Sequence, residues 1–278
     1  MGLLPTSVSH SNPAIPLPRS NSPAAGGSYA HHGHATSSAA LSSGRSKGGF
    51  EKMRKMLGKL VRPSRWPTMD FELAAWQMTY LCVAPRRVYR NVYYHKQTKN
   101  TWARDDPAIL IMMIGFLSSA AVLWTSLYLH SFSPIAWAGL ALKMVFRDFI
   151  ASGLIISTLL WSVILARLTF ELQYSFDVHT NSFFPLFLNL YLAQLILAPV
   201  VTRNNWVCLW VGNSLYLVAA TQYVYITYLG YNALPFLIRS ELLLFPIVLF
   251  LTLYVVSLLG FNLSKHLLEA YFSGLNSS

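Results

Sequence analysis

The chain has 278 residues, of which 54% are hydrophobic and only 11% are charged, and its mean hydropathy is +0.42. Soluble domains carry about 25% charged residues, so this composition argues against an ordinary soluble enzyme. Residues 1–106 hold 15 Lys and Arg against 5 Asp and Glu, whereas residues 107–278 hold 6 against 5. A cationic front joined to an almost uncharged remainder excludes a single globular domain and predicts an all-α, polytopic membrane protein.

The first 50 residues are rich in Ser, Gly, Ala, Pro and His and contain few bulky apolar side chains. Such a composition cannot bury enough surface to offset chain entropy, so we predict a disordered tail. The cluster His31, His32 and His34 could bind a metal weakly, but a solvated low-complexity tail is the interpretation we favour. Two cysteines, Cys82 and Cys208, are too far apart in sequence to indicate a disulfide framework or a zinc site. No cofactor is expected.

Two helices are predicted between the tail and the first membrane span. Residues 51–62 alternate apolar and basic side chains at helical spacing, which describes a basic amphipathic helix suited to an anionic leaflet. A solvated helix is the alternative. Residues 66–83 form the second helix, but the uncharged run from Leu73 to Pro85 is too short to cross a membrane. We therefore expect this helix to pack at the interface or against the bundle.

A basic stretch with interleaved aromatic residues follows. Its cations are the predicted contacts with a partner or the membrane surface: Arg86, Arg87, Arg90, Lys96, Lys99 and Arg104. Mixed cations and aromatic rings suit the lipid headgroup zone. They also suit RNA, because rings stack on bases while cations meet phosphates, and this alternative stays open as the weaker one. Asp105 and Asp106 stand at the start of the first span, where acidic residues favour a helix N-terminus.

Five long apolar runs follow Pro107, and each is close to the roughly 20 residues that a membrane-spanning helix needs. The predicted spans lie near residues 108–129, 149–168, 183–201, 207–229 and 242–263. The apolar segment 132–146 is interrupted by Pro134 and Lys143. We interpret it as a lumenal interfacial piece or as a helical lead-in to the second span.

The Lys and Arg bias of the loops predicts the orientation. With the N-terminus in the cytosol, 17 of these residues are cytosolic and 4 are lumenal, and an odd span count places the C-terminus in the lumen. Asn-x-Ser acceptors begin at Asn262 and Asn276. Asn262 lies close to the bilayer and Asn276 close to the chain end, so neither serves as a marker of topology.

Sequence signatures of enzymes are missing: there is no G-x-S-x-G, H-E-x-x-H, P-loop or G-x-G-x-x-G pattern. Asp177, His179 and Asn181, at the mouth of the third span, could bind a metal or act as an acid–base pair. A polar loop that satisfies helix ends needs the same residues, and we favour it. We interpret Arg147 and Asp148 as an interfacial pair before the second span.

The spans themselves contain amides and hydroxyls rather than ionisable groups at their centres. Gly212 and Asn213 indicate a close helix contact with an interhelical hydrogen bond. Packing is therefore a better interpretation of these polar side chains than a transport path.

Several motifs point to one family. They are WPTMDFE (66–72), WQM (76–78), PRRVYR (85–90), KQTKNTWARDDPA (96–108), FDVH with Asn181 (176–181), GN (212–213), LGY (229–231) and LPF (234–236). Over residues 64–272 the chain resembles the Unc-fifty (uncoordinated-fifty, Gmh-type) family. The long run 96–108 is the most specific of these matches.

This resemblance implies a five-span membrane protein of the Golgi and early secretory pathway, with relatives also at the endoplasmic reticulum or the inner nuclear membrane. It implies association with guanine-nucleotide exchange factors for Arf GTPases and, in animals, support for surface delivery of assembled receptors. RNA binding is ascribed to one animal member. No catalytic residues come with the resemblance, so we expect a protein that is not an enzyme.

The sequence therefore predicts three parts: a tail (1–50), a basic cytosolic and interfacial helical region (51–106) and a five-span bundle (107–278). The predicted function is that of a trafficking adaptor that contacts membrane lipids, an Arf exchange factor and membrane-protein cargo. The alternative is an intramembrane transporter or lipid-handling enzyme that uses Asp177 and His179.

Overall fold

The computed structural model describes residues 69–99, 106–162, 172–203, 205–234 and 239–273, a few isolated positions before residue 68, and residue 237; of residues 95–99 it describes the backbone alone. These residues form helices and no strand, within one compact unit spanning residues 45–278. The predicted tail with His31, His32 and His34, most of the predicted helix 51–62, and Asn276 lie outside the described residues.

Four of the described helical stretches are long and apolar enough to cross a membrane: Ala108–Tyr128, Leu172–Val201, Trp206–Asn232 and Ser240–Ser257. Their outward faces are apolar too. On the last stretch Leu249, Leu253 and Val256 are each more than half exposed, which suits contact with lipid rather than water. The prediction of an all-α membrane protein with several spans is confirmed.

The predicted count of five spans is not confirmed. Where the second span was expected, at residues 149–168, one continuous helix runs from α5 (Pro134–Leu142) through η3 (Lys143–Ala151) into α6 (Ser152–Leu160). Residues 163–168 lie outside the described part of the chain. This helix carries three charged side chains, Lys143, Arg147 and Asp148. For segment 132–146, the structure agrees with the second interpretation, a helix that leads into the second span.

Two predicted span boundaries were wrong. The third helical stretch begins at Leu172 rather than at residue 183, because α7 (Leu172–Phe187) continues through η5 (Leu188–Ala193) into α8 (Gln194–Val201). The fifth ends earlier than expected. There α10 (Phe245–Ser257), which follows the short helix η6 (Ser240–Leu244), stops before Gly260, whose φ of +136° turns the chain. A separate helix, α11 (Leu263–Phe272), follows.

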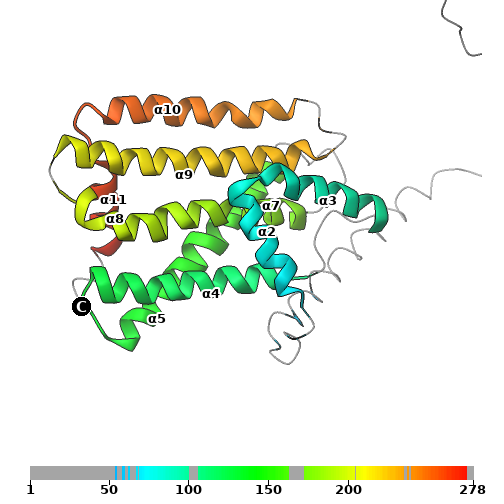
Figure 1. Ribbon diagram of the computed structural model, residues 1–278, viewed down its shortest axis with the longest axis horizontal. Coiled ribbons are helices and arrows are strands. Elements are labelled where there is room, and N and C mark those ends of the chain that lie inside the picture. The colour runs from blue at the N-terminus through cyan, green and yellow to red at the C-terminus, as the bar shows by residue number, and fades with distance from the viewer. Residues whose placement is uncertain are drawn as a thin grey trace, which may run out of the picture. The chain divides into compact units, whose positions relative to one another are not determined.

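The first and fourth spans lie close to where they were predicted. The first comprises α4 (Ala108–Leu123) and the π-helical turn η2 (Trp124–Tyr128). The fourth is a single long helix, α9 (Trp206–Asn232). Figure 1 shows α4, α8, α9 and α10 side by side, with α11 at one end of the bundle and α2 and α3 at the other.

Two short helices form the end of the bundle opposite to α11. Helix α2 (Phe71–Val83) begins where Asp70 accepts a hydrogen bond from Leu73 N at 2.9 Å, and it packs against α4 and α7. Helix α3 (Pro85–Lys99) packs against α9. The prediction that residues 66–83 pack against the bundle is therefore confirmed.

Glycines allow the closest approaches between helices. A Cβ on Gly230 would lie 2.7 Å from Val178 Cγ1 and 3.2 Å from Tyr89 Cε1, so α9 contacts α7 and α3 at this point only because the side chain is absent. A Cβ on Gly212 would lie 2.7 Å from Ser264 Cβ. The close contact predicted at Gly212 is confirmed: its nearest partner is α11, and Val201 Cβ of α8 would lie 3.3 Å away.

Candidate functional site

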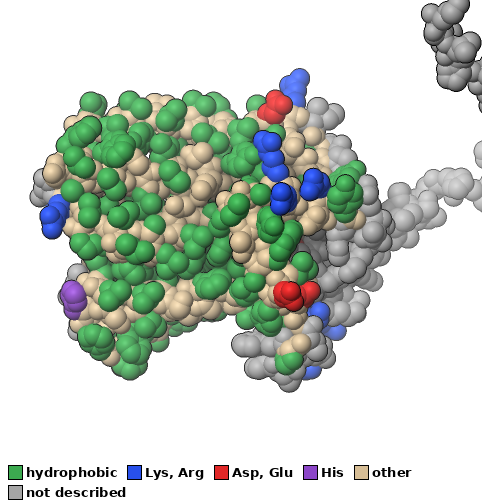
Figure 2. Space-filling view, in the orientation of Figure 1, with side chains coloured by type: hydrophobic (Ala, Val, Ile, Leu, Met, Phe, Trp, Pro, Cys, Tyr) green, Lys and Arg blue, Asp and Glu red, His purple; other side chains and the backbone are tan. Residues whose placement is uncertain are grey.

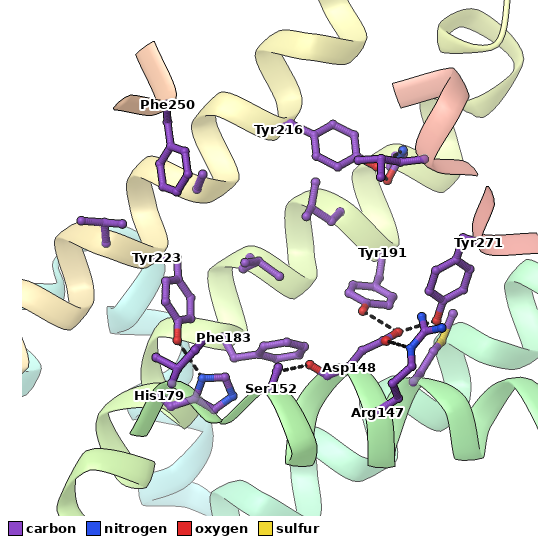
Figure 3. A pocket seen from close by; sticks show the side chains of 18 of the residues that line it. Arg147, Asp148, Ser152, His179, Phe183, Tyr191, Tyr216, Tyr223, Phe250 and Tyr271 are labelled. Carbon is purple, nitrogen blue, oxygen red and sulfur yellow. Dashed lines mark hydrogen bonds and ion pairs between the residues drawn. The ribbon is translucent and has the colours of Figure 1, made fainter. Parts of the chain in front are cut away.

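A cavity of about 790 Å³ lies within the bundle, a volume in the range of small-molecule sites. Most of its lining side chains are aliphatic or aromatic, and they come from α6, α7, α8, α9, α10 and α11 together with η2, η3, η5 and η6. Its polar groups include a cluster around Asp148, a cluster around His179, and the bonded pair of Gln194 and Tyr216 (Figure 3). We treat this cavity as one candidate site and the surface of α3 as the other.

Asp148 is the centre of the first polar group. Its side chain is 12% exposed, and Oδ1 accepts a hydrogen bond from Arg147 Nε at 2.7 Å. Oδ2 accepts hydrogen bonds from the Tyr191 hydroxyl at 3.1 Å and from the Tyr271 hydroxyl. Three donors therefore occupy most of the acceptor positions of this one carboxylate.

Tyr271 reaches Asp148 from α11, a helix that lies at the end of the bundle. Lys143 Nζ donates to the Tyr271 carbonyl oxygen and lies 4.1 Å from the centroid of the Tyr271 ring, while Arg147 Cζ lies 4.8 Å from the same centroid. Burial and the hydrogen bond to the Asp148 carboxylate both raise the pKa of Tyr271. Its hydroxyl therefore stays protonated and remains a donor.

His179 is the centre of the second polar group. Its Nε2 lies 3.2 Å from the Phe149 carbonyl oxygen and its Nδ1 lies 2.8 Å from the Tyr223 hydroxyl. A carbonyl oxygen can only accept, so Nε2 carries a hydrogen; in the neutral ring Nδ1 then accepts from Tyr223. Both ring nitrogens are thereby bonded within the protein. Gly153 of α6 packs directly against the imidazole ring, because a Cβ there would lie 2.5 Å from His179 Cδ2.

Segments of π-helix supply several of these groups. Arg147, Asp148 and Phe149 belong to η3, and Tyr191 belongs to η5. Carbonyls in both segments accept side-chain bonds: Phe149 O from His179, and Tyr191 O from Trp124 Nε1 at 2.8 Å. Single π-helical turns are frequent at functional sites, because they turn backbone and side-chain groups away from the regular α pattern. Here they face the cavity.

The predicted polar site around Asp177, His179 and Asn181 is placed differently from expectation. These residues lie inside α7 rather than in a loop at the mouth of a span, and their exposed fractions are only 8%, 2% and 2%. His179 alone of the three lines the cavity. The expected loop is wrong because polar side chains that bond to neighbouring helices allow a helix to continue through them.

Asn213 has a structural role. Its Nδ2 donates to Ser257 Oγ at 2.9 Å and to the Phe261 carbonyl oxygen at 2.8 Å, and its Oδ1 accepts from Leu263 N at 2.9 Å. These bonds join α9 to the end of α10 and to the start of α11. The predicted interhelical hydrogen bond is confirmed, and Asn213 is not among the residues that line the cavity.

The surface predicted to contact a partner lies on α3. Arg86, Arg87 and Arg90 are exposed, whereas Val88 and Tyr89 are buried in a cluster with residues of α9. The backbone of Lys96 and Lys99 continues α3, but their side chains, Arg104 and Asp105 lie outside the described residues. Asp106 does not cap α4. Its Oδ2 instead accepts from Asp70 N at 2.9 Å and links the starts of α2 and α4.

Figure 2 shows the contrast between this surface and the rest of the visible face. Hydrophobic side chains cover the bundle, and Lys and Arg gather over the end that carries α2 and α3. Arg86 Nε donates to the Tyr225 hydroxyl at 2.9 Å, and Arg87 Cζ lies 5.6 Å from the Tyr80 ring centroid. The bonded Arg86 fixes α3 on α9, and Arg87 and Arg90 remain available at the surface.

The predicted pair of Arg147 and Asp148 is present, but the two tyrosines that complete the group were not predicted. Tyr191 and Tyr271 come from positions 43 and 123 residues away along the chain, and no local pattern joins them to Asp148. The available signal was a carboxylate inside an apolar run, which is costly unless it is paired within the bundle. Among the described residues, no three His, Cys, Asp or Glu side chains gather in a way that could hold a metal ion.

Comparisons with known proteins agree on one family. The sequence model of the UNC-50 family matches residues 59–272. Protein GMH1 homolog of Schizosaccharomyces pombe is 41% identical over 217 residues, 73% of this chain and 92% of the relative. Protein unc-50 homolog of Dictyostelium discoideum is 40% identical over 219 residues (74% and 84%), and that of Homo sapiens is 41% identical over 223 residues (76% and 85%). No solved structure matches.

Proposed function

Because this chain belongs to the UNC-50 family, we propose that it is a trafficking adaptor of the Golgi and early secretory membranes. In this proposal the protein performs no catalysis. Its bundle resides in the membrane, and its α2–α3 end recruits a guanine-nucleotide exchange factor for an Arf GTPase from the cytosol. The vesicles formed there carry membrane proteins such as assembled receptors.

The charged face of α3 is the observation that supports this role. Residues 85–99 contain five Lys and Arg and no Asp or Glu. Burial of Val88 and Tyr89 against α9 fixes α3, and Arg87 and Arg90 point away from the bundle. Because α3 is already held in place, binding of a partner to it costs little backbone entropy. A rigid cationic face beside the bilayer suits an acidic protein surface and anionic lipids at once.

The proposed orientation follows from the distribution of charge. Placing α2 and α3 in the cytosol satisfies the positive-inside pattern, since 15 Lys and Arg precede the first span. The α11 end of the bundle is then lumenal. Five crossings require the helix that begins at Pro134 to traverse the membrane, and two of its charged side chains, Arg147 and Asp148, line the cavity.

Charge reversal on α3 tests the proposal. In a variant with Arg87→Glu and Arg90→Glu, Golgi recruitment of the exchange factor should fall at least tenfold, because each cation contributes about 1 kcal/mol near an anionic surface and two are replaced. Arg86 stays unchanged because it bonds to Tyr225. Recruitment is measured by fluorescence of the tagged factor on Golgi membranes, with the level and location of the variant recorded in parallel.

Arg203→Glu is the matched control. This exposed residue lies in the turn between α8 and α9, at the opposite end of the bundle. It should leave recruitment unchanged. Normal recruitment by the α3 variant at normal level and location would contradict the proposed docking face, and an equal loss in the Arg203 control would show that the effect is not specific to α3.

A further inference from the structure

The cavity, called the channel below, lies between two helices that have different neighbours. Helix α6 packs against α7, whereas α10 packs against α9, so α7 and α9 form the floor and α6 and α10 the two walls. Figure 3 shows Ser152 of α6 and Phe250 of α10 on opposite sides. Beside the lining residues, Leu159 of α6 and Leu249 of α10 are 58% and 52% exposed. The channel therefore borders the surface that faces lipid.

The channel has the length of one lipid leaflet. Asp148 and Leu160 both line it and lie on the same continuous helix. At a rise of about 1.5 Å per residue, they are about 18 Å apart, and the hydrocarbon of one leaflet is about 15 Å deep. Between them the walls are mainly aliphatic and aromatic, which suits a hydrocarbon chain and excludes a polar solute.

One end of the channel is polar and carries excess positive charge. Lys143 and Arg147 stand there with Asp148, whose carboxylate is occupied by three donors. The side chain of Arg147 is 55% exposed, and its guanidinium carries four N–H groups besides the one donated to Asp148. A guanidinium held in place by a carboxylate is well suited to bind an oxyanion.

We propose that this channel binds a single lipid with an anionic headgroup, its oxyanion at Arg147 and one hydrocarbon chain along α6 and α10. The chemistry shared by the candidate ligands is an oxyanion joined to a long alkyl chain. A phospholipid phosphate or a fatty-acid carboxylate can supply it. The headgroup end of this channel lies at the α11 end of the bundle, and the proposal does not rest on the adaptor function.

Photocrosslinking to the purified full-length chain in nanodiscs tests this inference. One arm uses a phospholipid with a photoactivatable acyl chain and the other a photoactivatable fatty acid, each competed with its unlabelled counterpart. Saturable labelling of peptides from α6 or α10 is expected in one arm, and that arm identifies the headgroup. Mass spectrometry of the purified chain should also show about one retained lipid of the same class per chain.

Two neighbouring isoleucines provide a matched pair of variants. Ile156 lines the channel, whereas Ile155 is 62% exposed on the outer face of α6. Ile156→Trp should fill the channel and reduce saturable labelling at least fivefold, and Ile155→Trp should leave it unchanged. Ala220→Leu fills the channel from α9 and provides a second blocking variant in case the first one fails to fold.

Arg147→Gln tests the headgroup contact. It should weaken competition by the anionic lipid at least fivefold, while competition by a neutral lipid with the same chain stays the same. The inference is overturned if neither probe labels the channel saturably, if Ile155→Trp and Ile156→Trp reduce labelling equally, or if neutral and anionic lipids compete equally with the wild-type chain.

Discussion

Gly153 is the position at which α6 meets the His179 ring, and Gly153→Ala perturbs this contact and the neighbouring one with Phe176. A Cβ there would lie 2.5 Å from His179 Cδ2, 2.7 Å from His179 Nε2 and 2.9 Å from Phe176 Cε2. The ring cannot swing away freely, because both of its nitrogens are bonded, to Tyr223 and to Phe149 O. We therefore expect α6 to shift or the bond to Phe149 O to break.

The cost can be worked out from three contributions. Overpacking a tight interior costs about 1–3 kcal/mol. Loss of one buried hydrogen bond costs about 1 kcal/mol. The higher helix propensity of Ala relative to Gly stabilises the folded state by about 1 kcal/mol. The net loss is about 1–3 kcal/mol, which for a chain of this size lowers the melting temperature by about 2–12 °C.

Thermal unfolding of the purified protein in detergent measures this effect. Gly139→Ala and Gly115→Ala are the controls, because no heavy atom lies within 4 Å of a Cβ at either position. They should melt at the wild-type temperature or above it. In a His179→Ala background, Gly153→Ala should cost less than in the wild type, because the clashing ring is gone. A Gly153→Ala protein as stable as the Gly139→Ala control would refute the packing described for α6 and α7.

Three further predictions concern the α11 end. Asn213→Leu should lower stability by about 3 kcal/mol, because the three hydrogen bonds that join α9 to α10 and α11 are lost; a wild-type melting temperature would contradict this. Tyr271→Phe should lower the free energy of unfolding by about 1.5–3 kcal/mol, because the Tyr271 hydroxyl donates to the charged Asp148. A loss below about 0.5 kcal/mol would argue against that hydrogen bond. Asn262 should remain unglycosylated, because its amide already donates to a backbone carbonyl of α8 at 3.0 Å and caps α11; a glycosidase-sensitive mobility shift that Asn262→Gln abolishes would contradict it.

Long apolar runs were sufficient to predict most of the fold. The first span differs from its predicted range by a single residue, because no charged side chain interrupts α4 and η2 before the chain turns. The last span was predicted too long. Its run continues without charge past Gly260, and hydropathy carries no information on the positive φ that ends the helix there.

Polar residues inside helices are where sequence reasoning failed. Asp177, His179 and Asn181 resembled a loop, yet α7 runs through them. For His179 the reason is clear, because Phe149 and Tyr223 satisfy its ring from two other helices. Such long-range partners are invisible in a single sequence, and without them a polar triplet favours a loop.

The cavity could not have been predicted either, because it depends on how α6 and α10 are held apart. Its polar end needs Asp148 and Tyr271 to meet, and these residues are brought together by α11, a helix that was not predicted after the last span. The exposed arginines of α3 were easier to predict from the sequence. Their cationic run interleaved with aromatic residues suits an interface, and the structure places Arg87 and Arg90 at the surface.

Cytosolic exposure of α3 is the claim on which the adaptor account depends most directly. The measurement is labelling with a membrane-impermeant maleimide in sealed Golgi vesicles, using Arg87→Cys and Arg203→Cys in a background without Cys82 and Cys208. Both positions are exposed and lie at opposite ends of the bundle. The account predicts that the cysteine at position 87 labels in intact vesicles and that the cysteine at position 203 labels only after permeabilisation. The reverse pattern would place α3 in the lumen and contradict the proposed recruitment of a cytosolic partner.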